Sequence, residues 1–131
     1  MGAEKKARAF LGSLSDASYL TLIRQGLEYI GFPRMVPSRA RIFVKPNLTF
    51  PTYRPGVMTS PQAVEGAILA LREYTPHIYL GDSDSGGYNR FSMDEVYRET
   101  GLLDFAVKYA VQVVNLSKIP TASISFRYQR R

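Results

Sequence analysis

A polar loop between residues 82 and 90 gathers several side chains that could do chemistry. It reads Asp-Ser-Asp-Ser-Gly-Gly-Tyr-Asn-Arg and follows the short apolar run of residues 77–80. Asp82 and Asp84 stand two residues apart, where their carboxylates could hold a divalent cation such as Mg²⁺ while water completes the shell. Paired glycines let backbone amides approach an anion closely. The loop therefore predicts a divalent-cation site at the two acids and contacts to a small anionic ligand from Gly86, Gly87, Asn89 and Arg90.

A second polar stretch follows the run Arg-Ile-Phe-Val-Lys at residues 41–45. Lys45 lies at the end of this run and Asn47 in the turn after it, so both are candidate contacts for an anion. The irregular segment that follows reaches Ser60, which forms a matched N-cap and first-turn pair with the proline after it. Helix N-termini bind phosphate or carboxylate, so Ser60 is a third candidate ligand residue.

Each of these residues also has a purely structural interpretation, which the sequence leaves open. Asp82 and Asp84 are residue types that cap turns and nearby helix amides. Lys45 fits a solvated side chain before a proline turn, and Ser60 fits a helix cap alone. Arg90 either pairs with one of the two acids or grips a ligand bidentately.

Helices and strands alternate along the chain. Apolar residues at helical spacing, with capping residues before them, predict helices over residues 17–30, 61–73, 92–100 and 102–110. Short apolar or alternating runs predict strands at residues 7–14, 41–45, 77–80, 111–116 and 121–128. We therefore expect a single α/β domain over residues 1–131, built from βαβ units. It should have a mainly parallel sheet of about four to five strands and Rossmann-like layering, with helices on the faces of the sheet.

This arrangement would bring the two polar stretches together. The carboxyl ends of parallel strands open on one edge of a sheet, where α/β proteins bind their ligands. Residues 45–48 and 81–84 both begin at such ends, so we expect them to share one rim. Gly66, inside the predicted helix 61–73, costs about 1 kcal/mol relative to alanine, which a close packing contact would justify.

The composition narrows the function classes. The absence of Cys removes disulfides, thiolate zinc sites, Cys nucleophiles and any iron–sulfur cluster held by this chain. His77, the only histidine, falls at the amino end of its strand, away from the predicted rim, so familiar nucleophile–base arrangements are hard to assemble. The sequence leaves open whether the domain is an enzyme. No run approaches the ~18 apolar residues of a membrane span, and the charged start does not read as a signal peptide, which favours a cytoplasmic protein.

The net charge of +6 comes from 17 basic and 11 acidic residues. The basic residues are scattered, with clusters only at residues 5–8, 34–41 and 127–131. No helix-turn-helix pattern and no aromatic RNA-binding signature accompanies them, so the sequence argues against a nucleic-acid partner. A small anionic ligand is the first functional hypothesis, and a non-catalytic interaction module for an acidic partner is the second. An oligomer is compatible with either.

Two stretches resemble a known family. The first runs Phe-Val-Lys-Pro-Asn-Leu-Thr at residues 43–49 and continues to Thr-Ser-Pro-Gln-Ala-Val-Glu at residues 59–65. The second is Ile-Tyr-Leu-Gly-Asp-Ser-Asp-Ser-Gly-Gly at residues 78–87. In order and spacing they resemble the prokaryotic family catalogued as domain of unknown function 362. In that family a strand ends in Lys-Pro-Asn, a Ser/Thr-Pro helix follows, and the next strand runs into a Gly-acid loop.

The resemblance implies an α/β domain, fused in some members to a ferredoxin-like iron–sulfur module. It assigns no reaction and therefore transfers no catalytic residue. Because this chain has no Cys-rich module, redox work would need a partner. If the domain is an interaction module, the resemblance implies an iron–sulfur or other acidic partner protein. The chain is also shorter than the full family domain, which is consistent with a partial one.

Overall fold

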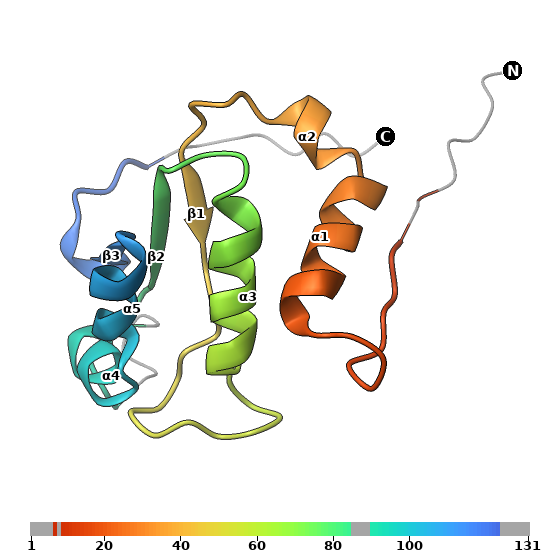
Figure 1. The fold of residues 1–131 in the computed structure, drawn as a ribbon. Helices are drawn as coiled ribbons and strands as arrows, with labels where there is room; N and C mark the ends of the chain where they lie inside the picture. Colours follow the sequence, from red (N-terminus) through yellow and green to blue (C-terminus); the bar gives the residue numbers. More distant parts are fainter. Residues whose placement is uncertain (1–6, 8, 85–89, 124–131) are drawn as a thin grey trace, which may run out of the picture.

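The computed structural model describes residue 7 and residues 9–84 and 90–123. In chain order its elements are α1 (Tyr19–Tyr29), α2 (Phe32–Met35), β1 (Ile42–Val44), α3 (Pro61–Leu71), β2 (Ile78–Asp82), α4 (Met93–Glu99), α5 (Leu102–Tyr109), β3 (Gln112–Asn115) and the 3₁₀ helix η2 (Leu116–Lys118). Within the described residues, three strands form one parallel sheet in the order β1-β2-β3 (Figure 1). The predicted α/β class and the parallel sheet are confirmed.

Local sequence sets the helix boundaries. Ser18, Ser60 and Ser92 begin α1, α3 and α4, and in each the hydroxyl oxygen accepts a hydrogen bond from the backbone amide three residues later, at 3.1–3.3 Å. α1 ends as predicted, because Gly31 takes the left-handed conformation with φ of 78°. No helix in the described part of the chain is long and apolar enough to cross a membrane.

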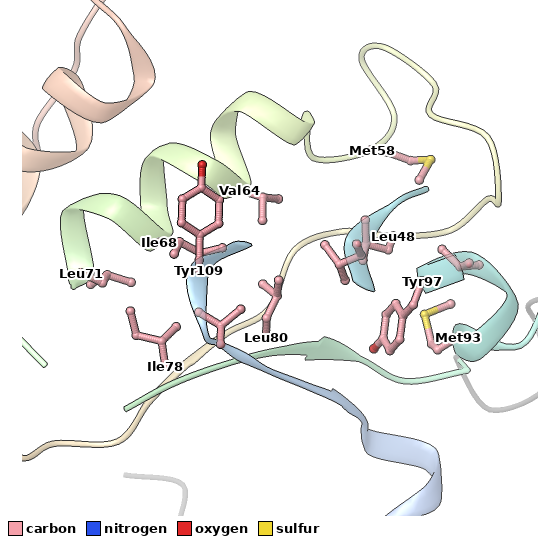
Figure 2. Close-up of a cluster of buried hydrophobic side chains, with 13 residues drawn as sticks. Leu48, Met58, Val64, Ile68, Leu71, Ile78, Leu80, Met93, Tyr97 and Tyr109 are labelled. Atoms are coloured by element: carbon pink, nitrogen blue, oxygen red, sulfur yellow. The ribbon is translucent and has the colours of Figure 1, made fainter. Parts of the chain in front are cut away.

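The core lies between the sheet and the three helices α3, α4 and α5. Ile78 and Leu80, which alternate along β2, join a buried cluster with Ile68 of α3 and Met93 of α4. Figure 2 shows these side chains on the helical side of β2. Ile68, Leu80 and Met93 are 0% exposed. Full burial of such a side chain contributes about 1.5–3 kcal/mol, so this cluster holds the helices to the sheet.

α1 packs against α3 and forms an outer layer (Figure 1). Gly66 of α3 makes this close approach possible. A Cβ at Gly66 would lie only 3.0 Å from the backbone nitrogen of Leu20 and 3.0 Å from Cβ of Tyr19. The packing contact expected for Gly66 is therefore confirmed, and its partner is α1.

Two predicted strands are not found. The strand expected at residues 7–14 is wrong for the described residues there, which have no strand pairing. The Phe10 ring instead lies beside Gly26 and Tyr29 of α1, so this segment packs against a helix. Of the strand expected at residues 121–128, residues 121–123 are irregular, and the rest lie outside the described residues. The described sheet therefore has three strands rather than four to five.

Gly81 lies where β2, β3 and α4 meet. A Cβ at this position would overlap the carbonyl oxygen of Val114, the register partner of Gly81 on β3. It would also lie 3.3 Å from the hydroxyl of Tyr97. Because the blocking atom belongs to the backbone of the neighbouring strand, it cannot swing aside as a side chain could.

We expect Gly81→Ala to destabilise the fold by about 3 kcal/mol, because overpacking against a strand backbone forces the strands apart. Urea unfolding measures the change. The matched control is Gly26→Ala in α1, where the nearest atom to the new Cβ is on the Phe10 ring, at 3.3 Å, and helix propensity favours alanine. Equal stability of the two variants would contradict the tight β2–β3 contact.

Candidate functional site at the carboxyl edge of the sheet

Polar side chains follow or end all three strands at one edge of the sheet. Lys45 follows β1, Asp82 ends β2 and Asn115 ends β3, in register with Asp82. The ammonium of Lys45 lies 2.9 Å from Oδ1 of Asp82, and the amide of Leu48 donates to Oδ2 of Asp82 at 3.5 Å. The loops after β1 and β2 therefore share one rim, as the sequence predicted.

An aromatic contact joins the same two loops farther out. The Phe50 and Phe91 rings pack edge to face, with centroids 6.4 Å apart. The guanidinium of Arg54 lies over Phe50, 3.7 Å from its ring centre. Such contacts add roughly 0.5–1.5 kcal/mol beyond burial, so they help to fix the position of the long segment after β1.

Asp82 is a buried carboxylate with partners on both oxygens. Oδ1 pairs with Lys45 and also accepts from the Ser83 amide at 2.8 Å, while Oδ2 faces the Leu48 amide. A buried charge is costly unless it is paired and hydrogen-bonded, and these contacts supply both conditions. Asp82 therefore has a structural role in joining β1 to β2.

Tyr97 of α4 reaches the same strand end from the core. Its hydroxyl oxygen accepts from the Asp82 amide at 2.5 Å and lies 3.0 Å from the Val114 carbonyl oxygen, to which it donates. Burial, opposed by the backbone hydrogen bond to Asp82 and assisted by the nearby carboxylate of Asp82, raises the pKa of Tyr97 to about 12. A neutral hydroxyl at this point bridges β2 and β3.

Asp84 holds the start of α4. Its Oδ1 accepts from the Met93 amide at 2.6 Å, and its own amide donates to Oγ of Ser117 at 2.8 Å. These bonds tie the loop after β2 to α4 and η2. The structural interpretation of Asp84, a cap on a helix amide, is therefore present in the fold.

Asn115 is the first of three polar side chains linked by hydrogen bonds on the β3 side of the rim. Its Nδ2 donates to Oδ1 of Asp94 at 3.1 Å, and Asp94 also pairs with Lys118. The hydrogen bond from Lys118 and then that from Asn115 hold the pKa of Asp94 below its ordinary value. Sequence reasoning missed these residues and Tyr97, because none belongs to a motif and each acts through a partner 15 or more positions away.

Asn47 bonds to the far end of its own loop. Its Nδ2 donates to the Val57 carbonyl at 2.7 Å, and its backbone amide donates to Oγ1 of Thr59 at 2.8 Å. These bonds close the segment between β1 and α3. Asn47 and Ser60 both line a surface hollow, whose walls also include Tyr19 of α1 and Tyr53.

The structure thus divides the predicted site. Lys45 and Asp82 meet at the rim, whereas Asn47 and Ser60 meet in the hollow at the start of α3. Arg90 is exposed, and the remaining predicted ligand residues, Gly86, Gly87 and Asn89, lie outside the described residues. Among the residues that the structure describes, no group of three or more His, Asp or Glu side chains is placed to hold a metal ion. A cation at Asp82 and Asp84 stays a prediction.

The protein is an α/β domain with a parallel sheet, and polar loops follow the carboxyl ends of its strands. A family model described as Domain of unknown function (DUF362) matches residues 42–130, and the chain belongs to this family. The match includes all three strands and leaves α1 and α2 outside it. Comparison with curated proteins and with solved structures gave no match.

Two Lys–Asp pairs at this edge differ in burial and allow a matched test. The Asp82 side chain is 8% exposed and that of Asp94 is 44% exposed. We expect Lys45→Met to destabilise the fold by about 1–3 kcal/mol, because a buried carboxylate loses its cation. Lys118→Met should change stability little, because water replaces the lost partner. Thermal unfolding measures the stability of both variants. Equal losses of stability would contradict the structural role of the buried Asp82 carboxylate.

Tyr97 predicts a pH dependence. Its pKa is about 12 in the folded protein and 10.0 ordinarily, so above pH 10 the unfolded chain releases this proton first. The stability that the neutral hydroxyl contributes is therefore complete below pH 10 and is lost as the pH rises toward 12. We expect Tyr97→Phe to cost about 1–3 kcal/mol at neutral pH and to flatten this alkaline loss. Urea unfolding across the range checks both, and parallel pH profiles would contradict the assignment.

Proposed function

We propose that this domain binds a small anionic ligand, with or without a divalent cation, beside the carboxyl edge of its sheet. The observation that carries the proposal is the hollow at the start of α3, which contains two of the predicted ligand residues, Asn47 and Ser60. Its described walls contain hydroxyl and amide groups and no carboxylate. An anion in the hollow would therefore meet no repulsion from a carboxylate among these residues.

The hydroxyl groups of the hollow can donate hydrogen bonds to a ligand. Oγ1 of Thr59 accepts from the Asn47 amide, and Oγ of Ser60 accepts from the Ala63 amide at 3.1 Å. A hydroxyl that accepts in this way keeps its own proton as a donor. The positive end of the α3 dipole lies at the same place, since α3 begins at the residue after Ser60. These features support binding of phosphate or carboxylate.

At Asp82 and Asp84, a divalent cation would compete with partners that the carboxylates already have. It would displace the Lys45 ammonium from Asp82 and the Met93 amide from Asp84. The anion is therefore the primary proposal, and the cation is tested separately. No reaction is assigned to the site.

A charge placed inside the hollow tests the anion. Ala63 lines the hollow in the first turn of α3, where an acidic side chain stabilises a helix. We expect inorganic phosphate or a phosphorylated compound to release or absorb heat on titration into the wild-type protein. Ala63→Asp should abolish that heat by repulsion while the fold stays intact, and the neutral Ala63→Asn should retain it. Heat that survives Ala63→Asp, or none with any anion, overturns the proposal.

Titration with Mg²⁺ or Mn²⁺ forms the second arm. If a cation binds at the predicted acids, Asp82→Asn and Asp84→Asn should each weaken it, and phosphate should bind more tightly in its presence. A cation that binds equally to both variants lies elsewhere.

A further inference from the structure

A small apolar cavity lies between the long segment that joins β1 to α3 and the helices α3 and α5. Leu48 and Met58 approach it from the segment, and Val64 approaches it from α3 (Figure 2). Leu102 and Phe105 of α5 complete its apolar wall. The cavity has a volume of about 30 Å³. Protein interiors hold few voids larger than a water molecule, so this one requires an explanation.

The lining of the cavity favours an apolar group over water. None of the described residues that line it carries a charge. Of its two threonines, Thr100 donates its hydroxyl proton to the Val96 carbonyl at 2.6 Å, and Oγ1 of Thr59 accepts from the Asn47 amide at 2.8 Å. Apolar cavities stay dry and take apolar ligands, whereas a buried water needs two to four polar partners. One water needs about 10–15 Å³, so the cavity has room for a chain of roughly two carbons.

The cavity adjoins the hollow at the start of α3. Tyr53, Met58 and Thr59 line both, so the two are separated by no more than the width of these side chains. Met58 is buried, and an unbranched methionine side chain adapts its shape to the group that packs against it. A ligand held in the hollow is therefore placed to extend an apolar group into the cavity.

We propose that the anionic ligand carries an apolar group of about two carbons, which occupies this cavity while the anion lies in the hollow. The inference rests on the function proposed above, because it needs an anion beside Thr59 and Ser60. It narrows the ligand class to small amphipathic anions, such as a monoalkyl phosphate or a short-chain carboxylate. A bare anion would use the hollow and leave the cavity unexplained.

Monoalkyl phosphates with chains from methyl to hexyl test the inference by titration calorimetry on the full chain. They share one head group, so differences in affinity between them report the tail. Burial of one methylene strengthens binding about fourfold. We expect this gain for about two successive methylenes once the tail reaches the cavity, and no further gain for longer chains.

Val64 gives a test in two directions. Val64→Ile adds one methylene to the wall of the cavity and should end the gain one carbon earlier, whereas Val64→Ala should extend it by at least one carbon. Ile68→Val is the matched control, because Ile68 lies one turn along α3, is fully buried and is not part of the cavity lining. It should leave the dependence on chain length unchanged. A general loss of stability would not move the preferred length in opposite directions, and thermal unfolding checks that all variants are folded.

Three results overturn the inference. If methyl phosphate binds, Ala63→Asp abolishes that binding and longer chains add nothing, the anion site stands and the cavity is only a packing void. If the preferred length is the same in both Val64 variants, the tail lies elsewhere. If no alkyl phosphate binds, or binding survives Ala63→Asp, the proposed function fails and this inference fails with it.

Discussion

The carboxylate of Asp82 is the constraint on which the carboxyl edge depends. It ends the central strand and is buried, so its charge must be met by partners. Lys45 and the Leu48 amide meet it from the loop after β1, and the Asp82 backbone bonds the Tyr97 hydroxyl of α4. A buried pair adds little net stability when its desolvation is counted. Its contribution here is geometric, because one side chain fixes two loops relative to each other.

That geometry also explains why the predicted site divides. Pro46 and Leu48 are buried, whereas Asn47 between them is exposed. Asn47 donates hydrogen bonds to Val57 and Thr59, at the far end of the same loop. The acid and the amide therefore serve different parts of one rim. Asp82 holds strand to strand, and Asn47 closes the loop that forms the hollow. The unoccupied donor capacity lies with the hydroxyl groups at the start of α3, away from the acids.

Helix caps set by near neighbours in the chain could be predicted from the sequence, and so could the shared rim, which follows from the parallel order of the strands. Individual contacts between distant side chains could not. Ser60, Ser92 and Gly31 act within a few residues, and their roles as helix caps follow from residue type. Tyr97 looked like an ordinary helix residue, because its partner at Asp82 is visible only once α4 packs on β2. The strand expected at residues 7–14 failed for the same reason, since a sheet partner is a long-range fact that local composition does not contain.

Topology explains why one face of the sheet carries no described helix. With strands in the order β1-β2-β3, both crossovers advance in the same direction, and right-handed connections then place α3, α4 and α5 on the same face. α1 precedes β1 and is the remaining long helix of the described chain, but its contact at Gly66 commits it to the outside of α3. The order of strands that gathers Lys45, Asp82 and Asn115 at one edge thus also places α3, α4 and α5 on one face of the sheet.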